Sequence, residues 1–436
     1  MQAPPLIRGG RARLAGWRSW TRIALLLLAV LVRALALADT DPKEVYSRWS
    51  TATDAGVYDR FGWNLATRGI LGVGERPSAF ALPAYPVLLG AVYRTVGHSP
   101  GAVRWVQVVL GALTVALLGR LARALGGELA EAIAMVLSAL DPFFVYFNRE
   151  ILTETLFIFA FAGMMLTATR VGTSGRRADG IAHGGFAALA IMTRPVGLFL
   201  EAGALLLARP WDRENRRPRL EGLLLGLLLV AGVWGGWMVR NRKVFGEVVP
   251  LDTHGGFALY AGQLFSRGLS ADEVFRSVGY SHREIEEGTL PGGPRGELEA
   301  DRRCATAARK MIREDRIAFI ATWPRNVGEL WLGMDFSDVA ARGGGGRLMA
   351  IAGLAVYVPL LGLALGGIGV LIRERKWGLL SPLLVILVLT TTVHAMVLGG
   401  KRYRVATVDP VLLVLAATSA SGSIRALRRR AERKGI

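Results

Sequence analysis

The chain has 436 residues, of which 52% are hydrophobic, and a mean hydropathy of +0.37. Soluble proteins contain about 45–50% apolar residues, so this composition excludes both an ordinary soluble protein and a disordered one. The net charge of +19 would suit a nucleic-acid-binding protein, unless its distribution along the chain has another cause. The single cysteine, Cys304, excludes disulfide frameworks and cysteine-based zinc sites.

The apolar residues are grouped into segments separated by charged loops. A helix needs about 20 apolar residues to cross a bilayer, so most of these segments are predicted as transmembrane helices. Two of them, 181–193 and 195–208, are short and are predicted as half-spans or kinked helices that meet at Thr193-Arg194-Pro195. The ten predicted spans are 20–38, 103–124, 128–146, 154–171, 181–193, 195–208, 221–239, 348–372, 377–398 and 404–422.

The positions of Lys and Arg predict the orientation, because short cytoplasmic loops are rich in them. The first 22 residues hold five Arg and no acid, and segment 209–219 holds five Arg and two acids. Segment 39–82 holds five bases and six acids, and segment 240–347 holds sixteen bases and fifteen acids. Both termini are therefore expected in the cytoplasm, and the two balanced segments on the exoplasmic side of the cell membrane. The excess positive charge orients helices, so no nucleic-acid partner is expected.

The N-terminal apolar segment has a second interpretation. Ala36-Leu37-Ala38 follows basic residues and an apolar run, which is typical of a signal-peptidase site. Cleavage there would leave the rest of the predicted topology unchanged.

The chain is expected to be an all-α polytopic membrane protein with about ten spans. Residues 1–239 form the main transmembrane module, with an exoplasmic loop, 39–102, that includes an interfacial helix at 83–97. Residues 240–347 form a small exoplasmic domain with helices near 296–320 and 323–333 and a hinge at Gly343–Gly346. The last spans occupy 348–422, and a basic cytoplasmic tail occupies 423–436.

Ionisable residues at the membrane boundary are costly unless they are paired or functional, so they are candidates for chemistry. Asp54 lies early in the first exoplasmic segment, and Glu150 and Glu154 lie four residues apart at the start of a predicted span. Asp141 and Asp409 are each followed by Pro, which is typical of a helix end.

Basic residues gather on the same predicted side of the membrane. They are Arg149, Arg194, Arg240, Arg242 and the run Lys401-Arg402-Tyr403-Arg404. An anionic lipid head group or a phosphate would suit this cluster, whereas snorkelling of single arginines is the alternative. The five histidines are scattered without ligand spacing, and no phosphate-binding glycine loop follows a strand pattern.

Several short motifs, in this order, resemble those of the GT-C glycosyltransferases that take sugars from polyprenyl-phosphate carriers. This superfamily includes the protein O-mannosyltransferases (family 39) and the aminoarabinose transferase of lipid A. The motifs are Asp54-xxx-Tyr58, Asn64-Leu65-Ala66 with Gly69, Pro83-Ala84-Tyr85-Pro86, Asn148-Arg149, Leu152-Thr153-Glu154, Thr193-Arg194-Pro195, Arg240-Asn241 with Phe245-Gly246, and Arg402-Tyr403-Arg404. One departure is Phe80-Ala81-Leu82, where related sequences often carry a charged residue.

The resemblance implies a glycosyltransferase whose partners are a polyprenyl-phosphate-linked sugar, an exoplasmic acceptor and the bilayer. Asp54 would be the general base, and Glu154 would help to position donor or acceptor. No cofactor is certain, and a divalent metal stays open. The residues expected to bind substrate are Tyr58, Arg76, Tyr85, Arg149, Glu150, Arg194, Arg240, Arg402 and Arg404.

A transporter or flippase of lipid-linked sugars is the competing hypothesis. Such proteins commonly carry inverted repeats and charged residues near the bilayer midplane. No repeat is visible here, and the acids gather at one face, which favours the enzyme. The sugar and the acceptor, which can be a protein, a lipid or a cell-envelope glycan, are not specified by the sequence.

Overall fold

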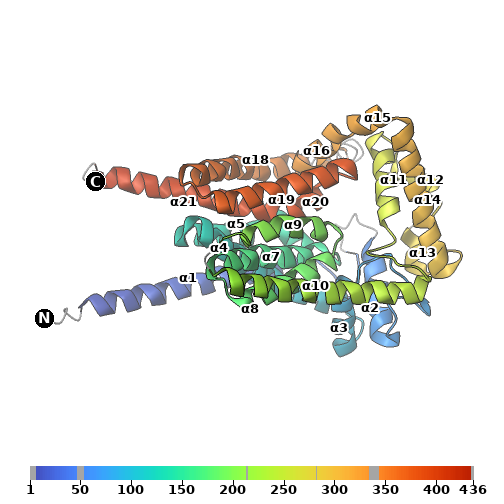
Figure 1. The fold of residues 1–436 in the computed structure, drawn as a ribbon, viewed down its shortest axis with the longest axis horizontal. Coiled ribbons are helices and arrows are strands. Elements are labelled where there is room, and N and C mark those ends of the chain that lie inside the picture. Colours follow the sequence, from blue (N-terminus) through green and yellow to red (C-terminus); the bar gives the residue numbers. More distant parts are fainter. Residues whose placement is uncertain (1–5, 47–53, 213–214, 281, 333–342, 434–436) are drawn as a thin grey trace.

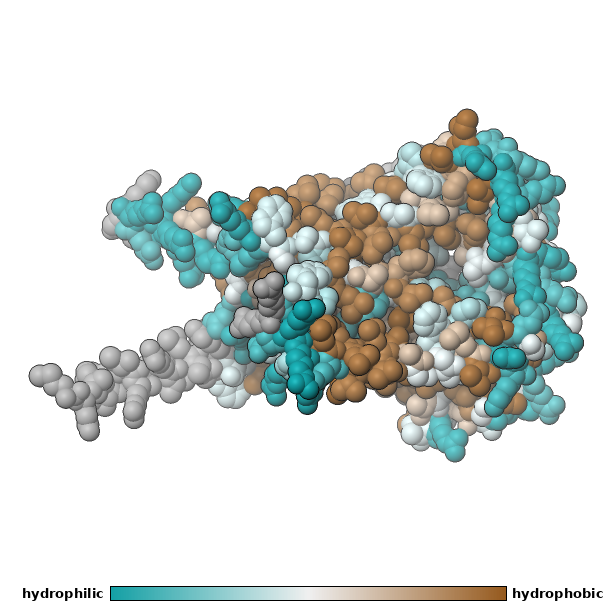
Figure 2. All heavy atoms as spheres, viewed as in Figure 1, coloured by the Kyte–Doolittle hydropathy of each residue, from teal (hydrophilic) through white to brown (hydrophobic). Residues whose placement is uncertain are grey.

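The computed structural model describes residues 6–46, 54–212, 215–280, 282–332 and 343–433. Within these ranges, seven helices are long and apolar enough to cross a membrane. On the face shown in Figure 2, apolar side chains cover the middle of the molecule and hydrophilic side chains lie toward both ends. The seven helices are α1 (Leu6–Ala36), α4 (Pro100–Gly126), α7 (Glu154–Ser174), α10 (Arg216–Phe245), α18 (Gly343–Arg373), α19 (Trp377–Met396) and α21 (Asp409–Arg433).

Shorter helices fill the bundle between these seven. They are α5 (Glu128–Leu140), α6 (Pro142–Phe147), α8 (Arg177–Ile191) and α9 (Val196–Leu207). The prediction of one span over 128–146 is wrong, because the Asp141 carboxylate accepts the backbone N–H groups of Phe143 and Phe144 and starts a new helix at Pro142. The predicted break between α8 and α9 at Thr193-Arg194-Pro195 is confirmed.

The remaining elements lie at one end of the bundle, where α11 to α16 form a cap (Figure 1). The start of α1 and the end of α21 lie at the opposite end. The elements of the first loop are α2 (Asp54–Arg68), α3 (Ala84–Val96) and an antiparallel strand pair, β1 (Gly72–Val73) and β2 (Arg76–Pro77). The cap contains α11 (Gly255–Ser266), α12 (Ala271–Val278), α13 (His282–Glu287), α14 (Gly293–Glu314), α15 (Arg316–Ala321) and α16 (Trp323–Leu332).

Three further predictions about boundaries are wrong. The helix predicted near 296–320 is divided into α14 and α15, since Asp315 caps the second. The predicted hinge, Gly343–Gly346, forms the first turn of α18. The last span begins at Asp409 rather than at 404, because residues 401–407 form a separate short helix, α20 (Lys401–Thr407).

Close packing of α8 against α10 fixes the α8–α9 corner, which carries Arg194. Gly180 and Gly184 of α8 face Gly222 and Gly226 of α10, so the two backbones approach closely. Small residues at this spacing are common where transmembrane helices meet, because packing rather than the hydrophobic effect drives their association. The position of Arg194 therefore depends on glycines that lie ten or more residues away.

A matched pair of substitutions tests this contact. A Cβ atom at Gly184 would lie 2.3 Å from the Cα of Gly226, whereas one at Gly185 would lie 4.0 Å from its nearest neighbour in Leu229. Gly184→Ala is expected to lower the free energy of unfolding by about 1–3 kcal/mol, as overpacking commonly does. Gly185→Ala is expected to leave it unchanged, and equal melting temperatures of the two variants in detergent would contradict this packing.

Candidate active site

Four elements bring ionisable residues together at the boundary between the bundle and the cap. Asp54 is the first residue of α2, and Glu154 is the first residue of α7. Arg194 lies at the corner between α8 and α9, and Arg402 lies in α20. The two acids suit their positions, since a negative charge is favourable in the first turn of a helix.

The four side chains form one continuous ion-pair network. Arg194 donates from Nη1 to Oε1 of Glu154 over 2.8 Å. Arg402 donates from Nε to the same Glu154 oxygen and from Nη1 to Oδ2 of Asp54, the latter over 2.6 Å. Arg402 therefore links the two carboxylates, and Glu154 links the two arginines.

Burial differs across this network. The Glu154 side chain has no exposed area and that of Arg194 is 12% exposed, whereas Arg402 and Asp54 are 25% and 24% exposed. Burial alone would lower the pKa of Arg402, but the nearby Glu154 and Asp54 carboxylates outweigh it and raise this pKa well above its usual value. The guanidinium of Arg402 therefore stays charged and keeps one side open to ligands.

A cavity of about 310 Å³ lies beside the network. Asp54, Tyr58, Arg194, Arg402 and Tyr403 line one part of its wall. A second part of the wall comes from the loops at 80–82 and 252–255, which include Phe80, Asp252 and His254. Glu154 contacts the arginines from behind, and the residues that line the cavity do not include it.

Tyr58 and Tyr85 form an aromatic pair at this site. Their rings meet edge to face with centroids 5.4 Å apart, and Tyr58 lines the cavity. Tyr85 is fully buried and donates its hydroxyl to Oε1 of Gln107 over 2.7 Å. Gln107 in turn donates to the backbone carbonyl of Glu150, whose side chain is also buried outside the cavity. Tyr85 and Glu150 thus support the site from outside the cavity.

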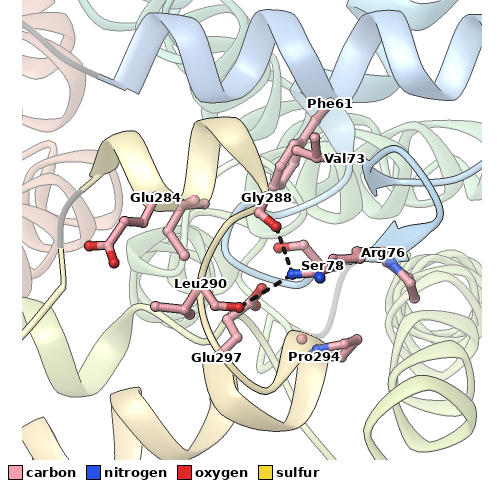
Figure 3. A pocket seen from close by; sticks show the side chains of 12 residues that line it. Phe61, Val73, Arg76, Ser78, Glu284, Gly288, Leu290, Pro294 and Glu297 are labelled. Atoms are coloured by element: carbon pink, nitrogen blue, oxygen red, sulfur yellow. Dashed lines mark hydrogen bonds between the residues drawn. The ribbon is translucent and has the colours of Figure 1, made fainter.

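The other predicted arginines contact protein groups away from the cavity. Arg149 pairs with Asp39 over 2.7 Å. Arg76 donates to the backbone carbonyl of Gly288 at the end of α13 (Figure 3). Arg240 donates to the backbone carbonyls of Ser78 and Leu71.

Arg404 is separated from Arg402 although the sequence places them in one motif. Its side chain is buried, its Nε lies 3.2 Å from Oδ1 of Asp409, and its guanidinium carbon lies 3.9 Å from the centre of the Tyr357 ring. This pairing also places Asp409 at the helix end that the following proline predicts. The structure does not bring Arg404 to the cavity.

Asp252 and His254 line the cavity, although neither was predicted as a site residue. Asp252 follows an apolar run and precedes a turn in the sequence, which is the weak signal that could have indicated it. Burial raises the pKa of its carboxyl to about 7, and the negative charges of Asp301 and Glu297 add to this effect. The cavity thus holds a second carboxyl group beside that of Asp54, and burial raises the pKa of this second group.

Metal ligation has less support from the side chains than phosphate binding. Within the described ranges, no group of three or more His, Cys, Asp or Glu side chains is arranged to hold a metal ion. Both Asp54 and Glu154 already bind Arg402. Two guanidinium groups beside a cavity are instead the arrangement that commonly binds phosphate.

Comparison with known proteins shows what the chain is similar to. A model of the dolichyl-phosphate-mannose-protein mannosyltransferase family matches residues 76–237. No curated protein sequence matches the chain. The archaeal oligosaccharyltransferase AglB from Archaeoglobus fulgidus, in complex with an inhibitory peptide and a dolichol-phosphate, is 14% identical with a TM-score of 0.54, over 96% of this chain and 52% of that chain.

Two further solved structures are similar to the chain. The apo form of the Archaeoglobus fulgidus oligosaccharyltransferase is 12% identical with a TM-score of 0.54, over 94% of this chain and 51% of that chain. ArnT from Cupriavidus metallidurans bound to undecaprenyl phosphate is 13% identical with a TM-score of 0.43, over 92% of this chain and 77% of that chain. The chain spans about half the length of the archaeal enzyme. The likeness to that enzyme shows that the two chains share a fold, so the predicted fold class, an all-α polytopic membrane protein, is confirmed.

The unequal burial of the two carboxylates predicts unequal effects on stability. Glu154→Gln removes the shared partner of two arginines inside the protein, and breaking a buried ion pair commonly costs about 3–5 kcal/mol. Asp54→Asn removes a partner of Arg402 whose side chain is 24% exposed. This substitution is expected to lower the free energy of unfolding by about 1 kcal/mol or less. Thermal unfolding of both variants in detergent measures this difference, and an equal or reversed order would contradict the network.

Proposed function

We propose that the chain is an integral-membrane glycosyltransferase that moves a sugar from a polyprenyl-phosphate carrier to an acceptor on the exoplasmic side of the cell membrane. The observation that carries this proposal is Arg402, which is charged, partly exposed in a cavity at the membrane boundary, and bonded to Asp54. The GT-C fold and the mannosyltransferase family model support the same reaction class.

Arg402 and Arg194 are the groups that would bind the donor phosphate. Both line the cavity, and Glu154 holds both at one oxygen, so their guanidinium groups are oriented before a ligand arrives. Arginine binds phosphate oxygens through paired N–H donors, and such charge-assisted hydrogen bonds are strong. The polyprenyl chain of the donor would remain in the bilayer while its phosphate reaches the membrane boundary.

Asp54 would act as the general base. It accepts a proton from the acceptor hydroxyl while the acceptor oxygen attacks the anomeric carbon, and the bond from that carbon to the phosphate oxygen breaks. The leaving polyprenyl phosphate keeps the electron pair, and the arginines stabilise its negative charge, so no separate acid is needed. A phosphate that binds Arg402 competes with Asp54 for this guanidinium and thereby frees the carboxylate.

Glu154 is best described as a positioning residue within this proposal. Its side chain is fully buried and contacts the arginines rather than the cavity. It therefore acts on the substrate through Arg194 and Arg402. This assignment refines the expectation that Glu154 itself helps to position donor or acceptor.

The competing transporter hypothesis fits the charge distribution less well. The network lies at the first residues of α2 and α7, at the end of the bundle near the cap. A carrier with alternating access commonly places such groups near the bilayer midplane. The positions of these acids therefore favour the enzyme.

Asp54→Asn tests the proposed base. The variant keeps the size of the side chain but cannot accept a proton, so transfer is expected to fall by about 10²–10⁴-fold. The assay uses radiolabelled undecaprenyl-phosphate sugars, with membranes from a strain lacking the protein as the source of acceptor. Binding of undecaprenyl phosphate to the purified variant is expected to stay within about threefold of wild type, because both arginines remain.

The control for this experiment is Arg303→Gln, which removes an exposed charge on α14 that does not line the cavity. It is expected to transfer sugar at the wild-type rate. Normal transfer by Asp54→Asn would disprove the base assignment. Absence of transfer by the wild-type protein with every donor sugar, together with carrier translocation in liposomes, would favour the transporter.

A further inference from the structure

We propose that Asp252, His254 and Phe80 form a subsite for a neutral sugar ring within the same cavity. This inference rests on the proposed function, because it assigns the other substrate contact of that site. The three residues line the part of the wall that the two extramembrane loops build, whereas the arginines line the part contributed by α20 and the α8–α9 corner. No motif in the sequence joins Phe80 to Asp252, and only the fold places them together.

The loop before Asp252 is attached firmly to the end of α10. Trp237 donates its indole N–H to the carbonyl of Leu251 over 2.6 Å, and Asn241 donates to the carbonyl of Val249 over 2.9 Å. The backbone N–H of Thr253 donates to the carbonyl of Ala79 over 3.0 Å. Asp252 is therefore held on both sides by hydrogen bonds, which fixes its position before a ligand binds.

Helix α14 joins the two loops through the buried carboxylate of Glu297. Glu297, which is 7% exposed, accepts the backbone N–H of Ala79 over 3.0 Å and the hydroxyl of Thr253. Figure 3 shows Glu297 close to Ser78 at the base of the first loop. Asp301 accepts the backbone N–H groups of Gly256 and Phe257, over 2.6 and 3.1 Å, at the start of α11.

The electrostatic environment of Asp252 selects against an anion. Asp301 and Glu297 both act on its carboxyl, and both are acidic. The cavity arginines are already bonded to Glu154 and Asp54. A second phosphate at this wall would therefore be repelled, whereas hydroxyl groups can donate hydrogen bonds to the carboxylate.

Aromatic rings next to Asp252 supply the apolar part of the subsite. The centroid of the His254 ring lies 4.6 Å from that of the Phe80 ring, and the two ring planes meet at 69°. It also lies 4.6 Å from the centroid of the Phe257 ring, with an angle of 28° between the planes. Ligand sites commonly combine such apolar surfaces with a few placed polar groups. A sugar ring matches this wall, because it offers an apolar C–H face and several hydroxyl donors.

The ring can be carried by the donor or by the acceptor, and the chemistry recognised at this wall is the same. A neutral methyl glycoside is therefore a suitable probe. Its binding to the full-length protein in detergent can be measured by saturation-transfer NMR, with methyl glycosides of several hexoses and pentoses. A serine- or threonine-containing dipeptide serves as the non-sugar hydroxyl probe.

At least one methyl glycoside is expected to bind the wild-type protein better than the dipeptide. Asp252→Ala is expected to weaken its binding about tenfold, as loss of a hydrogen bond to a charged group does. Asp252→Asn, which keeps the shape of the side chain, is expected to weaken glycoside binding less than Asp252→Ala does. The matched control is Glu299→Gln, an exposed carboxylate on α14 outside the cavity, which is expected to bind as wild type does.

Binding of undecaprenyl phosphate is measured in parallel, because it distinguishes failure of this inference from failure of the proposed function. Unchanged glycoside binding in Asp252→Ala, with undecaprenyl phosphate still bound, would overturn the subsite and leave the function intact. Loss of carrier binding in the wild type would count against both. If a glycoside remains bound when the protein is loaded with a sugar-bearing carrier, the subsite belongs to the acceptor; displacement assigns it to the donor sugar.

Discussion

The site depends on the ion pairs that the Glu154 carboxylate forms with Arg194 and Arg402. Glu154 lies at the start of the most buried of the seven long helices and has no contact with solvent. A buried carboxylate is tolerable when strong partners compensate for lost hydration, and here two guanidinium groups do so. Because Arg194 comes from the α8–α9 corner and Arg402 from α20, this one group fixes three segments that are far apart in the sequence.

A second buried carboxylate has the same role in the cap. Glu297 of α14 joins the loop after β2 to the loop before α11, as Glu154 joins the bundle to α20. Each acid lies behind a part of the cavity wall and orients the residues in front of it. The cavity thus has one cationic part suited to a phosphate and one carboxyl-bearing part suited to hydroxyl groups, and Asp54 is bonded to the first.

Much of this architecture could be predicted, because ionisable residues next to apolar segments are conspicuous in a sequence. Asp54, Glu154, Arg194 and Arg402 were all identified in this way, and they are the residues that the structure brings together. The prediction was wrong for the span over 128–146, where hydropathy does not show the helix start that Asp141 creates. Hydropathy windows measure apolar content and are insensitive to capping.

Arg404 and Asp252 show two other limits of sequence analysis. Arg402 and Arg404 share a motif, but residues two positions apart in a helix are rotated by about 200° around its axis. Only Arg402 therefore reaches the cavity, while Arg404 pairs with Asp409. Asp252 lies in a segment with balanced charge, so neither hydropathy nor charge clustering marks it. Its position in the cavity depends on hydrogen bonds from α10 and α14, and these contacts form only when the chain is folded.

In the proposed reaction, Arg402 exchanges Asp54 for the donor phosphate. A structure of the full-length protein with bound undecaprenyl phosphate, determined by cryo-electron microscopy, tests it most directly. We expect the phosphate on Arg402 and Arg194, with Glu154 still bonded to both. The Asp54 carboxylate is expected to leave its present 2.6 Å contact with Arg402 and to face the cavity. A phosphate bound away from these arginines, or an Asp54–Arg402 bond that stays intact, would contradict it.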